Sequence, residues 1–254
     1  MPTISLPQLV VNTISEYKGS IEQDIETLTQ TYTKAEISKL VGGLSSPSKM
    51  PCHSYSLAAS RCNVGSKLKN IPNSVCYSCY AADNAAWLKQ GKHSGMYQFA
   101  NVKNAMERRY QSLFTSTWVP AMVYLIRKTG NAYFRWHDSG DLQSAEHLTN
   151  IAKVALATPE VKHWLPTREY KLVRDWMAVN AVPDNLVIRV SAPMVDTVLN
   201  NFPTSSLVLE NKTPQDLNLP VTATECKAYL SDNKCNACRA CWSKSTTHVW
   251  YHKH

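Results

Sequence analysis

Cysteines are the residues of this chain whose type and spacing point most directly to chemistry. The 254-residue sequence contains eight of them, in two separated sets of four. The first set lies in the first third of the chain and the second near the C-terminus, and their members are Cys52, Cys62, Cys76 and Cys79, then Cys226, Cys235, Cys238 and Cys241. Because four thiolates complete a tetrahedral metal site, this grouping indicates metal ligands.

The second set contains the run C-x2-C-x2-C, within CKAYLSDNKCNACRACW. Structural zinc is usually bound by two C-x2-C pairs from different chain segments, whereas three thiolates in one short run are typical of iron–sulfur ligands. The first interpretation is therefore an iron–sulfur cluster of the [4Fe-4S] type, present once or twice, with zinc as the alternative. Cys52 stands apart in KMPCHSYS and could instead be a small buried hydrophobic residue.

Bulk properties limit the environment and the partners. No N-terminal segment has the features of a secretion signal, so we expect reduced thiols rather than disulfides. No run approaches the ~20 apolar residues that cross a bilayer, and we expect no membrane association. The net charge of +8 and pI near 9.0 favour a polyanionic partner such as nucleic acid, although an ordinary basic surface explains them equally well.

The hydrophobic pattern predicts an α/β fold. Residues 1–45 are expected to form a mostly helical N-terminal extension, and residues 46–254 one domain with cysteine-rich metal-binding segments at both ends. From residue 132, short apolar runs alternate with amphipathic helical stretches: strands are predicted at 132–140, 161–169, 185–193 and 205–211, with helices at 143–158 and 170–181. Such β-α-β units build a parallel sheet, open or curled into a full or partial TIM-like barrel.

Polar residues collect where the predicted strands end, and parallel strands of this kind end on the same side of a sheet. The candidates for catalysis are His137, Asp138, Asp141, Arg168, Glu169 and Arg189. His137 with a neighbouring aspartate could act as an acid/base pair, the arginines could hold a carboxylate or phosphate, and Glu169 could be a base or a ligand. The alternative is structural: Asp141 caps the next helix, and Arg168 pairs with Glu169.

Several long motifs resemble a known family. CNVGSKL, SVCYSCYA, FRWHDSGDLQSAEHL, HWLPTREY, RVSAPMVD and CNACRACW are similar, in this order, to motifs of the bacteriophage family called gene product eighty-eight, over a match from about Lys49 to His254. The resemblance implies a phage-encoded protein in the cytoplasm of the infected bacterium. It also implies metal binding by every cysteine named above except Cys52.

The layout resembles, more distantly, radical S-adenosylmethionine enzymes, which pair a partial α/β barrel with an N-terminal cluster. Their C-x3-C-x2-C motif would require a cysteine where this chain has Pro72, so the sequence does not predict S-adenosylmethionine as a cofactor. Two functions remain. The first is an iron–sulfur redox or radical-type enzyme with its cavity at the strand ends, and the second is a zinc-stabilised nucleic-acid-binding protein.

Overall fold

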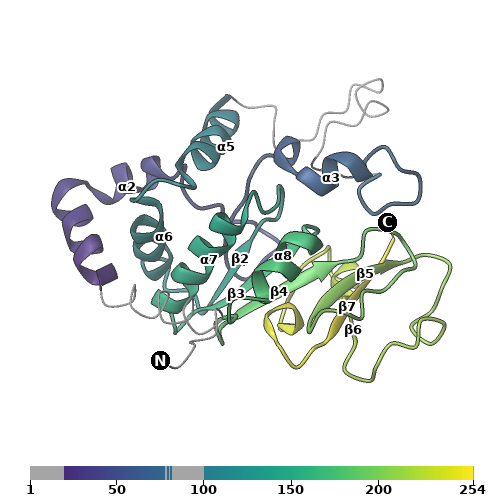
Figure 1. Ribbon diagram of the computed structural model, residues 1–254. Helices are drawn as coiled ribbons and strands as arrows, with labels where there is room; N and C mark the ends of the chain where they lie inside the picture. The colour runs from purple at the N-terminus through teal and green to yellow at the C-terminus, as the bar shows by residue number, and fades with distance from the viewer. Residues whose placement is uncertain (1–19, 78, 80, 82–99, 254) are drawn as a thin grey trace, which may run out of the picture.

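The computed structural model describes residues 20–77, 79, 81 and 100–253 (Figure 1). Its centre is a seven-stranded, wholly parallel sheet with the spatial order β1-β2-β3-β4-β5-β7-β6. The strands are β1 His53–Tyr55, β2 Tyr133–Trp136, β3 Lys162–Thr167, β4 Leu186–Ser191, β5 Ser205–Leu209, β6 Thr224–Glu225 and β7 His248–His252. The prediction of an α/β fold with a parallel sheet is therefore confirmed.

The sheet is open, with β1 and β6 at its edges, so the barrel is not confirmed. These helices all precede β4 in the chain: α2 Lys34–Leu40, α3 Asn63–Leu68, α5 Ala100–Ser112, α6 Trp118–Arg127, α7 Ala145–Ala157 and α8 Tyr170–Met177. Beyond β4 the chain supplies loops and short 3₁₀ turns in place of crossover helices among the described residues. In a closed barrel, helices after each strand form a ring around the sheet. After β4 the described residues do not supply these helices.

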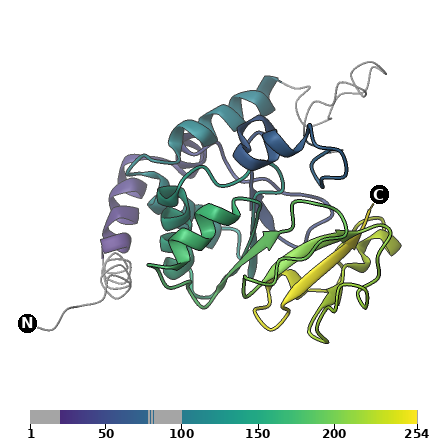
Figure 2. The same ribbon diagram turned by 45° about the vertical axis from the view of Figure 1, so that its right-hand side comes forward.

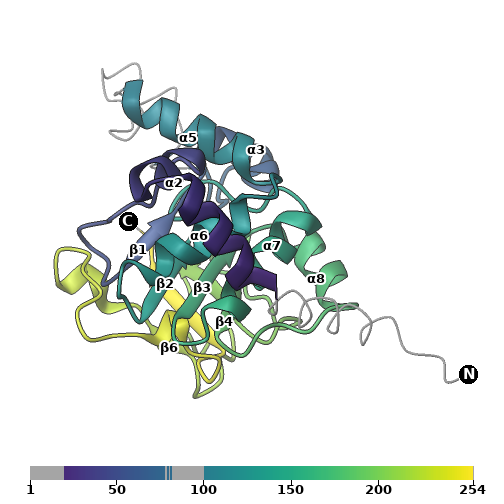
Figure 3. The same ribbon diagram turned by 90° about the vertical axis from the view of Figure 1, so that its left-hand side faces the viewer.

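Helices α6, α7 and α8 lie on one side of the sheet, and the C-terminal segment lies on the other (Figure 3). Side chains on the helical side form the main core, in which Phe134 and Trp136 of β2 meet Trp118 of α6. Phe134 and Trp136 share this face because successive side chains in a strand point to opposite faces, and one residue separates them. Tyr133 and Arg135 therefore project toward the C-terminal segment.

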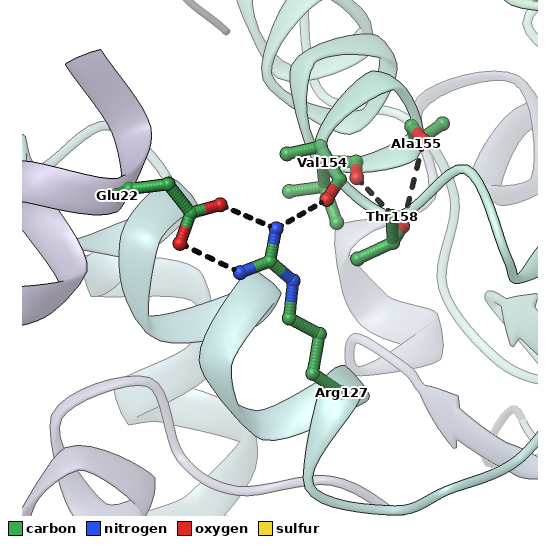
Figure 4. Close-up of polar contacts among 6 residues, drawn as sticks. Glu22, Arg127, Val154, Ala155 and Thr158 are labelled. Atoms are coloured by element: carbon green, nitrogen blue, oxygen red, sulfur yellow. Dashed lines mark hydrogen bonds and ion pairs between the residues drawn. The ribbon is translucent and has the colours of Figure 1, made fainter. Parts of the chain in front are cut away.

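The N-terminal segment packs on this same main core. Ile21 and Leu28, in helical residues 20–31, and Ile37 of α2 are almost fully buried with the core residues of α6 and α7. Arg127 of α6 donates two hydrogen bonds to the Glu22 carboxylate, at 2.9 and 2.7 Å, and a third to the Ala157 carbonyl (Figure 4). Residues 20–45 thus share their hydrophobic contacts with the sheet domain.

The C-terminal segment covers the second face of the sheet, away from α6 and α7 (Figure 2). Trp242 lies within 5.1 Å of Trp164 of β3 and 5.5 Å of Tyr133 of β2, measured between ring centroids. Its indole Nε1 donates to the Phe134 carbonyl at 2.8 Å. Among the described residues, no helix is long and apolar enough to cross a membrane.

Candidate metal centre and strand-end site

All four cysteines of the C-terminal set line one cavity of about 650 Å³. Its walls are formed by two 3₁₀ turns, Lys227–Leu230 and Ala240–Trp242, and by β7, the last strand in the sequence. Val249 and Trp250 of β7 are among the lining residues. We call it the C-terminal cysteine cavity. Cysteines that are up to 15 residues apart in sequence therefore face one space.

Backbone contacts fix where each thiol enters this cavity. The Cys226 amide donates to the Trp250 carbonyl of β7 at 2.8 Å, and the Cys235 amide donates to the Lys49 carbonyl at 3.2 Å. The Cys238 amide turns back to the Cys235 carbonyl at 3.0 Å, through Asn236 with a left-handed φ of 43°. Asparagine tolerates this conformation better than most residues, and it closes the C-x2-C turn.

Arg189 is a fully buried cation beside this cavity. Its guanidinium donates only to backbone carbonyls, those of Ser205, Thr247, Ala240, Ser243 and Thr246. No carboxylate of the described residues lies within ion-pair distance of it. A buried charge is costly unless it is paired. In the described residues this cation is bonded to carbonyl oxygens and has no anionic side chain as partner.

Two more arginines approach the cavity by stacking on aromatic rings. The guanidinium carbon of Arg135 lies 4.6 Å from the Trp164 ring centroid, and that of Arg239 lies 5.1 Å from the Tyr133 centroid. Neither has an ion-pair partner among the described carboxylates. Burial raises the pKa of the Cys241 thiol to about 12, and the charge of Arg189 opposes that shift. The cavity therefore combines thiols with uncompensated positive charge.

Cys52 belongs to this side of the sheet, not with the other N-terminal cysteines. It packs with Trp164 and Trp242, and the neighbours that influence its pKa include Arg135 and Cys235. Burial raises the pKa of its thiol to about 12. The two sets of four in the sequence thus become three and five in space.

The other three cysteines lie at the carboxyl ends of the strands. Burial raises the pKa of Cys62 to about 12, with smaller contributions from Asp141, Cys79 and Cys76, while Arg168 lowers it. The Cys79 amide donates to the Cys76 carbonyl at 3.2 Å, which closes the second C-x2-C turn. We call Cys62, Cys76 and Cys79 the strand-end cysteines.

The acidic residues near the strand-end cysteines accept hydrogen bonds from neighbouring loops. One Asp141 oxygen accepts from the Leu142 amide and the Thr167 hydroxyl, and the other accepts from the Arg168 amide, at 2.6–2.8 Å. Glu169 accepts from the Val64 amide at 2.9 Å, at the first turn of α3. No ion pair joins Arg168 to Glu169 in the described structure. Both acids therefore hold loops in place.

His137 follows β2 in the left-handed region, with φ of 54°, and is buried. Its ring lies 5.3 Å from that of His147 in α7, and neither of its nitrogens has a hydrogen-bond partner in the described part of the chain. The expected hydrogen bond to Asp138 or Asp141 is therefore not formed. The Asp138 amide donates to the Ser56 hydroxyl. Burial lowers the pKa of His137 well below its usual value, so the ring is neutral.

The six candidate catalytic residues do not all meet in one place. Asp141, Arg168 and Glu169 surround the strand-end cysteines, and His137 faces α7. Asp138 is held through its amide by Ser56, and Arg189 lies in mid-strand on the opposite face of the sheet. Arg189 does not join the strand-end group, because its side chain points to the second face of the sheet, one position away from the core residue Val190. In the described residues, no three His, Cys, Asp or Glu side chains are drawn together closely enough for a single metal ion.

Comparison with known proteins decides the family. The model of the family described as Gene product 88 matches residues 18–244. The chain belongs to this family. The match confirms the resemblance to the phage family and begins well before Lys49, so it includes most of the N-terminal segment that the motifs had left outside.

No curated protein and no solved structure matches the chain. The distant resemblance to radical S-adenosylmethionine enzymes is not shown by these comparisons. Membership of the Gene product 88 family names no reaction. Function must therefore be argued from the site.

Proposed function

We propose that this Gene product 88 protein is a phage-encoded iron–sulfur protein that acts in redox or radical-type chemistry in the cytoplasm of the infected host. Cys226, Cys235, Cys238 and Cys241 hold a [4Fe-4S] cluster in the C-terminal cysteine cavity. Reduced thiols are available in that compartment, where disulfides are rare. The observation that carries the proposal is the convergence of these four cysteines on one cavity.

The charges around the cavity support a negatively charged occupant. Four thiolates outweigh the positive charge of an iron–sulfur core, so the bound cluster is an anion overall. Arg189 is buried and has no carboxylate partner among the described residues. Aromatic rings hold Arg135 and Arg239 near the cavity. A bound cluster would supply the missing partner, and hydrogen bonds and nearby charge are the means by which proteins adjust cluster potentials.

The run of Cys235, Cys238 and Cys241 favours a cluster over zinc, because three thiolates in one short run are typical of iron–sulfur ligands. A tetrahedral zinc with bonds of about 2.3 Å brings its sulfurs to about 3.8 Å from one another. Thiolates that bind four different irons stay farther apart. Among the described residues no three His, Cys, Asp or Glu side chains are close enough to hold one ion, so zinc binding would require the cysteine side chains to rearrange.

Replacement of one ligand tests this assignment. Cys238→Ser removes an exposed thiol, so the apoprotein should fold, and we expect the protein purified without oxygen to lose the iron and sulfide of the C-terminal cavity. Cys52→Ala is the matched control, because Cys52 is buried among tryptophans and should not be a ligand. Equal iron and sulfide content in the two variants would refute the assignment.

Zinc-stabilised nucleic-acid binding is the second candidate. Lys227 and Lys234 line the cavity, and Tyr229 and Leu230 beside them are exposed, as in surfaces that combine positive charge with an aromatic side chain. Fluorescence anisotropy with a labelled single-stranded oligonucleotide distinguishes the two functions. Tight, salt-sensitive binding by a zinc-loaded protein free of sulfide would favour this second function.

A further inference from the structure

A second cavity, of about 460 Å³, is lined by residues of α3, by Glu169 and by residues of α8. We call it the α3–α8 cavity. Because α8 begins at Tyr170, just after β3 ends at Thr167, the cavity lies at the carboxyl edge of the sheet, where ligands bind in open parallel sheets. Its volume is within the range of small-molecule sites.

A hydrogen bond joins the two walls of this cavity. The Val64 amide, in the first turn of α3, donates to the Glu169 carboxylate at 2.9 Å. Glu169 is buried, and its own amide donates to the Thr167 hydroxyl at 3.0 Å, at the end of β3. The position of α3 relative to α8 is therefore fixed by contacts with the end of the sheet.

The cations that line the cavity are not paired, whereas its acids are. Lys67 and Lys171 are exposed, and neither forms an ion pair with a carboxylate of the described residues. Glu169 is bonded to the backbone of α3, and Asp175 accepts two hydrogen bonds from the Arg174 guanidinium, at 3.1 and 3.0 Å. The two lysines can therefore bind an anionic ligand.

The rest of the lining includes an aromatic residue and two aliphatic ones. Tyr170 is exposed, and Val64 and Leu172 are half-buried. An exposed aromatic ring is the surface on which nucleic-acid bases stack, and lysine binds phosphate as a point charge. The cavity thus offers a flat apolar surface beside two positive charges.

We propose that the α3–α8 cavity binds a nucleotide unit, with the base stacked on Tyr170 and the phosphate at Lys67 and Lys171. The ligand is a free nucleotide or the end of a nucleic-acid strand, because both present a phosphate beside an aromatic base. This binding activity goes beyond the iron–sulfur function and does not depend on it, since no described cysteine lines the cavity.

Isothermal titration calorimetry of the full-length protein with adenosine 5′-monophosphate tests the proposal. We expect this nucleotide to bind about tenfold more tightly than adenosine or inorganic phosphate, because each of those makes only one of the two contacts. A 5′-phosphorylated oligonucleotide distinguishes the two sources: tighter binding than the mononucleotide assigns a strand end, and equal or weaker binding assigns a free nucleotide. No measurable binding of either the mononucleotide or the oligonucleotide would overturn the proposal.

Variants locate the binding at this cavity. Lys171→Gln and Tyr170→Ala should each weaken binding of the mononucleotide about tenfold, equivalent to ~1.4 kcal/mol. Lys69→Gln and Tyr77→Ala are the matched controls, because they change exposed residues of the same types that do not line the cavity, and both should bind as the wild type does. Lys171→Gln alone should also reduce the salt dependence of binding. Unchanged binding in both cavity variants, or equal weakening in the controls, would refute the site.

Discussion

Buried polar side chains carry most of the functional information at the scale of single residues. Arg189 was expected to hold a ligand at the strand ends, yet it donates to five backbone carbonyls on the second face of the sheet. Asp141 was considered as either a catalytic acid or the cap of the next helix, but Ser144 is the N-cap of α7, and the Asp141 carboxylate instead joins the end of β3 to the loop after β2. Residue type could be read from the sequence, but the direction of a side chain depends on strand register.

Buried histidines make the protein sensitive to acid. Burial lowers the pKa of His147 and of His163 to about 3, and that of His137 well below 6.5. The unfolded chain takes up protons near pH 6.5 while the folded chain does not, so stability falls as pH drops below about 6.5 and continues to fall toward pH 3. For His147 alone the loss between pH 7 and pH 5 is about 2 kcal/mol.

Urea unfolding at pH 7 and pH 5 measures this effect. His147→Asn keeps an acceptor near the Gln143 amide but does not titrate, so the variant should lose less stability over this interval than the wild type. His53→Gln, at a partly exposed position, is the control and should behave like the wild type. An equal pH dependence in His147→Asn and wild type would show that His147 is not held neutral.

Among the secondary-structure elements, strands β2 to β5 were predictable and β6 and β7 were not. β2 to β5 follow apolar runs bounded by polar or glycine-containing turns, and the alternation with helices fixed their order. β6 has two residues and is too short for any period, while β7 directly follows the cysteine segment and pairs with β5 over five residues. These two strands position Cys226, so the shape of the C-terminal cysteine cavity could not be predicted.

Helix α2 offers a test of how its N-terminus is stabilised. Thr33 and Glu36 form a capping box, in which each side chain bonds to the backbone amide of the other residue. Thr33→Ala should lower the melting temperature by about 2–4 °C, because an N-cap contributes about 1 kcal/mol in a protein of this size. Thr29→Ala, in the preceding helix and also exposed, should not lower it. A melting temperature unchanged by Thr33→Ala would mean that α2 unfolds independently.

The whole molecule is a sheet with a different cover on each face. The helical face contains one continuous core that includes Ile21, Leu28, Ile37 and Val41 from the N-terminal segment. The second face is covered by the C-terminal cysteine segment, with Trp242 as its main contact. The sequence predicted metal-binding segments at both ends but not that the sheet would separate the strand-end cysteines from the other five, because Cys52 precedes β1 directly.

Removal of residues 1–44 tests whether the N-terminal segment is an extension or a part of the core. Four aliphatic side chains buried at ~1.5–3 kcal/mol each contribute about 6–12 kcal/mol, as much as the net stability of a typical domain. We therefore expect the truncated chain not to fold, as judged by circular dichroism. Glu22→Gln, which removes only the exposed ion pair with Arg127, should remain folded. Cooperative unfolding of the truncated chain near the wild-type temperature would show instead that the N-terminal segment is an extension that the fold does not need.

The central claim is that the C-terminal cysteines bind an iron–sulfur cluster, and the iron, zinc and acid-labile sulfide content of the protein purified without oxygen tests it most directly. We predict a brown protein with iron and sulfide in similar amounts, and their loss from the C-terminal cavity in Cys238→Ser but not in Cys52→Ala. Stoichiometric zinc without sulfide in the wild-type protein would contradict the account.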